Sequence, residues 1–322
     1  MTAVKTQIGW YGLGSMGRPM AENLQKHLTK TAEPALIYYN RTMSSGATLT
    51  SLGAMPAESF TDLVKESDII FTMVANDSIL EELVTQAVQV VKGLSNKVFV
   101  DCSTVHPSTI ERLSEKLSQH SAILVSAPVF GGPSIAVTGK LVFALGGPDA
   151  GCEAVKGYIL DVMGRKIIRC GENAQSSSML KIGGNIVTLN LMEAVGEAQV
   201  FAEQTGLGTT AMEELIAEAF GPVAGGLTSG IYAPTLGTRP GFGVSLSIKD
   251  ADHALAITRE RKFKLPGLEL AKENMAAARE YGGECLDASS MYGILRQQAG
   301  LPFWNEKSRQ GGKGEVQAEA LH

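Results

Sequence analysis

"IGWYGLGSMGRPMAENL", residues 8–24, is the stretch that decides the fold. Its first four residues form a short apolar run typical of a buried strand, and the residues after Gly17 have the spacing of an amphipathic helix. Between them, Gly12 permits a tight turn, Gly14 lets backbone N–H groups approach a pyrophosphate, and Gly17 lets helix and strand pack closely. The helix N-terminus adds partial positive charge. The stretch therefore predicts the first βαβ unit of a dinucleotide-binding sheet.

The first half of the chain continues this alternation of apolar runs and amphipathic stretches. Strands are predicted at 8–13, 35–39, 68–75, 97–103, 122–130 and 141–147, and helices at 18–28, 78–91 and 107–120. Strands that alternate with helices form a parallel, doubly wound sheet with crossover helices. We therefore predict an α/β fold class, with an N-terminal Rossmann domain over residues 1–165 that binds NADP.

Beyond residue 165 helical patterns replace the strands, which predicts an all-α second domain over 166–304. Residues 176–206 can form one helix of roughly 30 residues, about 45 Å long, as a spine between the domains. Glycines at 183, 184 and 196 cost this helix stability and predict close approach of another backbone or a ligand. The Gly- and Pro-rich stretch 221–243 is predicted to be a connection, and 305–322 a polar, mobile tail.

Composition narrows the function classes. The chain has 322 residues, a net charge of −5 and scattered lysines and arginines, which disfavours nucleic acid as a partner. Its four cysteines form no CxxC pair and have no histidine at ligand spacing, so neither a zinc site nor any other metal is expected. No apolar run reaches membrane length and no presequence precedes the first strand, so a cytoplasmic location without membrane contact is expected.

The cofactor preference is predicted from "YYNRT", residues 38–42, at the end of the second strand. An NAD site needs a carboxylate here for the ribose 2′-hydroxyl. Asn40 has no charge, whereas Arg41 can meet a 2′-phosphate bidentately and Thr42 adds a hydroxyl. NADP fits better than NAD. The alternative is that Arg41 is a solvated turn residue, in which case NAD would be used with modest preference.

Lys181 is the only charged residue between Glu172 and Glu193. On a helix, Lys181 and Asn185 lie one above the other on one face, an arrangement suited to a general acid/base with an orienting amide. A lysine in an apolar cleft has its charged form disfavoured, so we expect its pKa to fall toward the range of efficient proton transfer. The alternative is a lysine at a domain boundary that extends its ammonium to water.

These motifs occur together in an order that resembles the β-hydroxyacid dehydrogenases, the group that includes 3-hydroxyisobutyrate dehydrogenase, glyoxylate/succinic semialdehyde reductases and 6-phosphogluconate dehydrogenase. They are "GLGSMG", "NRT", "DCSTVHP" (101–107), "APVFGG" (127–132), "KIGGN" (181–185) and "IKDADHAL" (248–255). The resemblance covers nearly the whole chain to about residue 300. It implies a Rossmann domain followed by an all-α domain, and an NADP-dependent dehydrogenase or reductase acting on a CH–OH group. Relatives are commonly dimers or tetramers.

The resemblance also implies roles for individual residues. Lys181 would exchange a proton with the substrate oxygen, and Asn185 would hold that oxygen. The substrate contacts implied are Thr104, Phe130, Gly131, Gly132, Phe242, Lys249 and Asp250. The cofactor contacts implied are Gly12, Leu13, Gly14, Ser15, Met16, Gly17, Asn40, Arg41, Thr42, Val74, Ala75, Asn76, Ser103, Thr104 and Lys249.

Phe130 departs from the family pattern, which usually has Ser-Gly-Gly where this chain has Phe130-Gly131-Gly132. A phenyl ring cannot hydrogen-bond a substrate carboxylate and makes the pocket more apolar. Three kinds of substrate are compatible with a phenyl ring at this position: a bulkier or aromatic β-hydroxy compound, an aldehyde, or an acid held by backbone N–H groups and Lys249. Two other functions remain open: an imine reductase or reductive aminase, against which Lys181 argues, and a catalytically silent NADP-binding protein.

Overall fold

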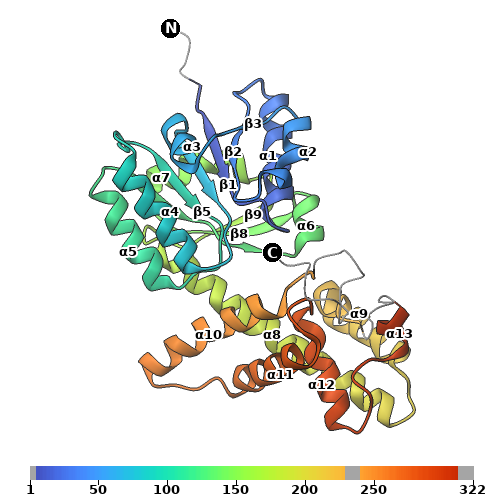
Figure 1. Cartoon of the computed structure of the whole chain (residues 1–322). Coiled ribbons are helices and arrows are strands. Elements are labelled where there is room, and N and C mark those ends of the chain that lie inside the picture. Colours follow the sequence, from blue (N-terminus) through green and yellow to red (C-terminus); the bar gives the residue numbers. More distant parts are fainter. Residues whose placement is uncertain (1–4, 229–239, 311–322) are drawn as a thin grey trace. The chain divides into compact units, whose positions relative to one another are not determined.

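The computed structural model of the chain describes residues 5–228 and 240–310 (Figure 1). It divides into two compact units, Met1–Lys181 and Ile182–His322. The division falls inside the long helix α8 (Gln175–Gln204). The two compact units thus divide 16 residues after the predicted domain boundary at residue 165, which remains a prediction.

The first unit is built on a six-stranded sheet of parallel strands in the order β3-β2-β1-β4-β5-β6. Its strands are β1 (Ile8–Tyr11), β2 (Ile37–Tyr39), β3 (Met55–Pro56), β4 (Ile69–Thr72), β5 (Val98–Asp101) and β6 (Ile123–Ser126). The order reverses between β1 and β4, and dinucleotides bind at such a reversal, beyond the carboxyl ends of the strands. The predicted doubly wound parallel sheet is confirmed.

Each face of this sheet is covered by its own helices. The helices of the unit are α1 (Gly17–Lys30), α2 (Ala47–Ser51), α3 (Phe60–Glu66), α4 (Asp77–Val90), α5 (Pro107–Ser118), α6 (Pro133–Val137) and α7 (Asp149–Ile159), with a 3₁₀ turn at Met43–Gly46. Trp10 and Phe71 stack in the core beneath α1 and α7, whereas Ile70 and Phe99 face α3, α4 and α5. Both faces are apolar because parallel sheets are buried on both sides.

A second, three-stranded sheet corrects one prediction. The run 122–130 is not one strand, because it ends at Ser126 as β6 and resumes as β7 (Val129–Phe130) in the other sheet. There β7 pairs antiparallel with β8 (Leu141–Leu145), which pairs parallel with β9 (Gly164–Arg169). Pro128 lies at the break and cannot donate a backbone hydrogen bond, so it interrupts a strand pattern that is apolar throughout.

The second unit is helical. Its elements are the greater part of α8, then α9 (Thr209–Gly225), α10 (Val244–Arg261), α11 (Pro266–Gly282), α12 (Met291–Gln298) and α13 (Glu306–Gln310), with a 3₁₀ turn at Ala288–Ser290. The 30 residues of α8 confirm the predicted spine helix. Close packing accounts for Gly196, since a Cβ there would stand 2.9 Å from the Leu295 side chain of α12.

Two predicted irregular stretches are partly helical. The predicted connection begins inside α9, because the helix continues through the four residues after Gly221. The helix kinks at this point, where Gly221 adopts φ 81° and Pro222 follows. Residues 306–310 of the predicted tail form α13, in which Lys307 pairs with Glu213 at 3.0 Å. Residues 229–239 of the predicted connection and 311–322 of the predicted tail lie outside the described residues.

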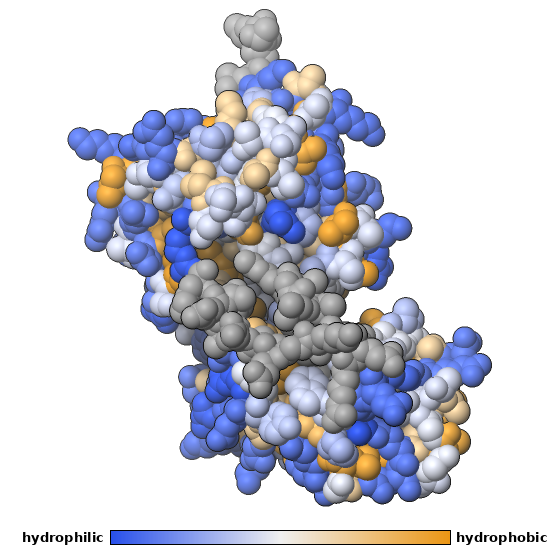
Figure 2. All heavy atoms as spheres, turned by 45° about the vertical axis from the view of Figure 1, so that its right-hand side comes forward, coloured by the Kyte–Doolittle hydropathy of each residue, from blue (hydrophilic) through white to orange (hydrophobic). Residues whose placement is uncertain are grey.

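Within the described ranges, none of the helices combines the length and the apolar character that crossing a bilayer requires. On the face drawn in Figure 2, hydrophilic side chains are interspersed with small groups of hydrophobic ones. Such a mixture is usual for a protein surface in water.

Candidate active site

Residues 12–17, the loop between β1 and α1 that is here called the phosphate loop, contain three glycines with different surroundings. Gly12 adopts φ +98°, and a Cβ there would stand 2.1 Å from the carbonyl oxygen of Met73. A Cβ on Gly17, where α1 begins, would stand 2.0 Å from the carbonyl oxygen of Gly12. Gly14 differs, because it is exposed and no atom lies within 4 Å of the position that its Cβ would take. The open backbone of Gly14 is therefore the surface available to a pyrophosphate.

Asn40, Arg41 and Thr42, from which the cofactor preference is predicted, follow the carboxyl end of β2. Asn40 connects this end to the phosphate loop, since its Oδ1 accepts from the backbone N–H of Leu13 at 2.9 Å and its Nδ2 donates to the Thr42 carbonyl at 2.8 Å. Arg41 and Thr42 are exposed and follow directly. The asparagine thus serves the loop geometry, and the arginine supplies the charge available to a ligand.

A buried carboxyl group, which the sequence analysis did not assign, joins the loops after β4 and β5. Asp101 Oδ1 accepts from the hydroxyls of Thr72 at 2.8 Å and Ser103 at 2.7 Å, and Ser103 Oγ accepts from the Val74 N–H at 2.8 Å. Asp101 Oδ2 is buried without a hydrogen-bond partner among the described residues. Burial raises the pKa of Asp101 to about 6, although both hydroxyl donors act to lower it. A carboxylate as the last residue of an apolar strand was the signal that could have revealed it.

The predicted cofactor residues of these two loops lie on either side of that network. Val74 and Ser103 are part of it, Ala75 is exposed, and Thr104 is half-buried. Asn76 caps α4, since its Oδ1 accepts from the backbone N–H of Ile79 at 3.1 Å. The network therefore sets the relative position of the two loops that border the nicotinamide side of a Rossmann site.

The raised pKa of Asp101 gives a prediction about stability. A pKa of about 6 in the folded chain, against 3.8 for an unperturbed aspartate, means that the folded state binds this proton more tightly. Its contribution to the free energy of unfolding is complete below pH 3.8 and is lost as pH rises through 6, a change of about 3 kcal/mol. Urea unfolding of Asp101→Asn and the parent should show that difference between pH 4 and pH 8. A constant difference across this range would contradict the prediction.

Lys181 lies beside the ring of Phe130, which is followed by two glycines. The Nζ atom is 4.8 Å from the centroid of the Phe130 ring, within the range of a cation–π contact. Both side chains are half-buried, and Gly131 and Gly132 are exposed, with Gly131 at φ +120°. The first unit thus brings the predicted proton carrier and the aromatic ring together, and the two exposed glycines follow the ring directly in the chain.

The second unit brings together three predicted residues that are distant in sequence. Asn185 Nδ2 donates to Asp250 Oδ2 at 2.6 Å, and Lys249 Nζ lies 3.0 Å from Asp250 Oδ1. Asn185 and Asp250 are 4% exposed, so this polar cluster is removed from water. Since Asn185 follows Lys181 by one turn of α8, its amide is held in orientation at the stretch of helix that carries the lysine.

Phe242, the remaining predicted residue, lies just before α10. Its backbone N–H donates to Asp287 Oδ2 at 2.8 Å, and Asp287 Oδ1 accepts from the N–H of Ser289 at 3.0 Å. Asp287 is therefore a further residue absent from the prediction, and it anchors the segment that carries Phe242 to the turn before α12.

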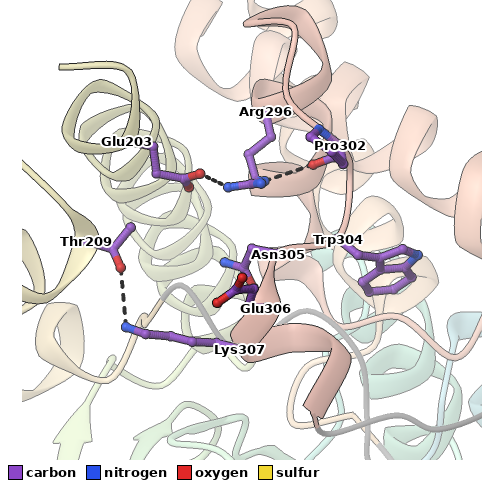
Figure 3. A pocket seen from close by; sticks show the side chains of 8 residues that line it. All are labelled: Glu203, Thr209, Arg296, Pro302, Trp304, Asn305, Glu306 and Lys307. Atoms are coloured by element: carbon purple, nitrogen blue, oxygen red, sulfur yellow. Dashed lines mark hydrogen bonds and ion pairs between the residues drawn. The ribbon is translucent and has the colours of Figure 1, made fainter. Parts of the chain in front are cut away.

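A separate pocket of about 400 Å³ in the second unit contains none of the predicted site residues (Figure 3). Its lining is Glu203, Thr209, Arg296, Pro302, Trp304, Asn305, Glu306 and Lys307. Arg296 pairs with Glu203 and donates Nε to the Pro302 carbonyl at 2.9 Å, and Lys307 donates to Thr209 at 3.3 Å. These bonds join α12 to α8 and α13 to α9, which is a structural role. Over 5–228 and 240–310, no group of His, Cys, Asp or Glu side chains is placed to hold a metal ion.

Two family models match the chain. Residues 7–171 match the NAD-binding domain of 6-phosphogluconate dehydrogenase, and residues 176–295 match the model described as NAD-binding of NADP-dependent 3-hydroxyisobutyrate dehydrogenase. Among solved structures, 3-hydroxyisobutyrate dehydrogenase of Mycobacterium tuberculosis with L-serine superposes with a TM-score of 0.76 at 24% identity, covering 91% of this chain and 100% of that one.

Two relatives share nearly their whole length with this chain. 2-Hydroxy-3-oxopropionate reductase of Escherichia coli is 30% identical over 306 residues, which are 91% of this chain and 98% of the relative. An NADH-dependent oxidoreductase of Aspergillus ustus is 29% identical over 292 residues, 89% of this chain and 98% of the relative.

Proposed function

The chain belongs to the β-hydroxyacid dehydrogenase family, and on this premise we propose that it is an NADP-dependent oxidoreductase that interconverts a β-hydroxy acid, or a related alcohol, and its aldehyde or keto form. The observation that carries the proposal is the placement of Lys181 Nζ 4.8 Å from the ring of Phe130, the residue before the exposed glycines 131 and 132, in a unit whose phosphate loop is open at Gly14. NADP, when bound, supplies or accepts the hydride.

Lys181 is the proton carrier in this proposal. In reduction its ammonium donates a proton to the carbonyl oxygen, and in oxidation the neutral amine takes the proton from the hydroxyl. Asn185 Nδ2 donates one of its two N–H groups to Asp250, which orients the amide, and in this proposal the amide holds the substrate oxygen. Thr104 and the backbone N–H groups of Gly131 and Gly132 are the donors proposed for the rest of the substrate.

The proposed activity is tested by following NADPH absorbance in both directions against a panel of hydroxy acids, aldehydes, β-keto compounds and imines. We expect turnover of hydroxyl and carbonyl compounds. A preference for imines would replace the proposal by the reductive aminase alternative, and cofactor binding without turnover of any compound would leave a silent NADP-binding protein.

Arg41 is proposed to select NADP over NAD. The relatives do not decide the cofactor, since one is named for NADH and one family model for an NADP-dependent enzyme. The support is local: Arg41 is exposed at the end of β2, Asn40 beside it carries no charge, and Asn40 is engaged with the backbone of Leu13 and Thr42. A guanidinium at this position matches a 2′-phosphate.

Replacing Arg41 by alanine should therefore weaken the binding of NADPH but not that of NADH. A charge-assisted bond to phosphate contributes about 1.5–3 kcal/mol, so we expect the KM for NADPH to rise roughly 10- to 100-fold. NADH, which has no 2′-phosphate, is the internal control, and its KM should change less than about threefold. Equal effects on the two cofactors would show that Arg41 acts on the loop and not on the phosphate.

A second copy of the chain is the proposed protein partner. On α9, Leu215, Phe220 and Val223 are 55%, 67% and 70% exposed, and on α8 Val187 and Phe201 are 67% and 62% exposed. Large apolar side chains that stay exposed on two helices of one unit are candidates for a subunit interface. Homodimers or homotetramers would cover them, and sedimentation velocity at micromolar concentration measures which mass is present. A monomer would contradict this part of the proposal.

A further inference from the structure

Phe130 is placed so that its ring, and not a polar group, borders the Lys181 ammonium. On β7, Val129 is buried at 4% exposure in the core, and the alternation of a strand turns Phe130 to the opposite side. There the ring is half-buried and its centroid lies 4.8 Å from Lys181 Nζ. A half-buried aromatic beside an ammonium leaves part of its surface for a further group.

Buried serines hold the two residues in this relation. Ser177 Oγ donates to the Ser126 carbonyl at 2.9 Å, and the hydroxyls of Ser126 and Ser178 lie 3.3 Å apart. Ser126 ends β6 four residues before Phe130, and Ser178 precedes Lys181 by three residues on α8. Because these serines are at most 2% exposed, the start of α8 is tied to the chain segment that leads into β7.

The backbone after Phe130 adds a second constraint. Gly131 adopts φ +120°, and a Cβ there would stand 2.8 Å from the Leu141 side chain. The chain therefore turns sharply directly after the ring, which keeps the ring at the end of the strand and leaves the two glycines exposed. Ring and glycine backbone thus form two different surfaces, one apolar and one polar.

A substrate that receives a proton from Lys181 has its reacting oxygen about 3 Å from Nζ. With the ring centroid 4.8 Å from the same atom, a chain attached to the reacting carbon can come within van der Waals reach of the Phe130 ring. The face of a phenyl ring carries negative electrostatic potential, so it repels a carboxylate and packs well against alkyl or aryl groups. The polar arm of a substrate is thereby directed to the glycine side.

We infer that Phe130 is a specificity-determining residue that favours substrates whose chain places an alkyl or aryl group against the ring and disfavours those that place a carboxylate there. This inference rests on the proposed function, since it takes Lys181 as the proton carrier. It narrows the substrate class to carbonyl and hydroxyl compounds that are bulkier and more apolar on the Phe130 side than short semialdehyde acids.

The test compares two aldehydes of equal shape. Succinic semialdehyde carries a carboxylate where 4-methylpentanal carries an isopropyl group, and both are assayed with NADPH. We expect kcat/KM of the parent to be at least tenfold higher for 4-methylpentanal. Phe130→Ser should shift this ratio at least tenfold toward the semialdehyde, whereas Phe130→Leu, which keeps the apolar surface, should shift it less than threefold.

Phe130→Thr is the second polar variant, because a β-branched residue suits a strand and secures the test if the serine variant is poorly folded. A parent that prefers the semialdehyde, or a ratio that the polar variants leave unchanged while turnover continues, would overturn the inference and leave the proposed function intact. If the parent reduces neither aldehyde nor any carbonyl compound of the wider panel, both the inference and the proposed function fail.

Discussion

Replacing Lys181 by methionine is expected to lower kcat for carbonyl reduction by about 10³-fold, since positioned general acids contribute about 10²–10⁴-fold. Methionine keeps most of the length of the side chain and its packing against the Phe130 ring, but it carries no proton to donate. The phosphate loop and Arg41 are on other elements, so the affinity for NADPH, measured by fluorescence titration, should change less than twofold.

Lys140→Met is the matched control, because Lys140 is an exposed lysine of the same unit. Its kcat should equal that of the parent. A Lys181→Ala variant adds a second readout, since ethylamine in the buffer can occupy the space of the missing side chain and restore part of the activity. If Lys181→Met keeps kcat within tenfold of the parent, the lysine is a structural residue and the proton must come from elsewhere.

The parts of the fold that follow from strong local patterns were predictable from the sequence. The strand–loop–helix of 8–24 reads clearly because strand period, glycine spacing and helix period change within a few residues. The α8 helix was predictable for the same reason, through its 30 residues of sustained helical spacing. Such segments depend little on contacts that are distant in the chain.

Other elements were not predictable because distant contacts decide them. The run 122–130 is apolar throughout, and its division between two sheets depends on whether β5 or β8 offers the pairing edge. β9 contains Arg165, Lys166 and Arg169, a composition that does not stand out as a strand before β8 is placed beside it.

The candidate site shows the same division. The glycines of the phosphate loop and Lys181 are marked by spacing and by their neighbours, so they stood out in the sequence. The contact of Asn185 with Asp250 joins α8 to α10, and no local pattern announces it. Asp101 was missed because its role comes from Thr72 on the neighbouring strand, which becomes its partner only in the folded sheet.

Exchanging Gly12 for alanine is expected to destabilise the first unit by about 4 kcal/mol or more, a large part of the total stability of a typical domain. Gly12 has φ +98°, which L-residues rarely adopt, and its Cβ would stand 2.1 Å from the Met73 carbonyl oxygen. Backbone of β1 or of the turn after β4 would have to move to relieve that overlap. Urea unfolding followed by circular dichroism measures the loss, and an unchanged midpoint would contradict this geometry of the turn.

Gly14→Ala separates folding from cofactor binding within the same loop. Nothing lies within 4 Å of a Cβ at Gly14, and its φ is not positive, so the free energy of unfolding should change by less than about 0.5 kcal/mol. The same Cβ would occupy the open backbone that we assign to the pyrophosphate, and we expect the Kd for NADPH to rise roughly 10- to 100-fold. A Gly14→Ala protein that binds NADPH like the parent would place the pyrophosphate elsewhere, because in this loop only Gly14 combines an exposed backbone with room for a ligand.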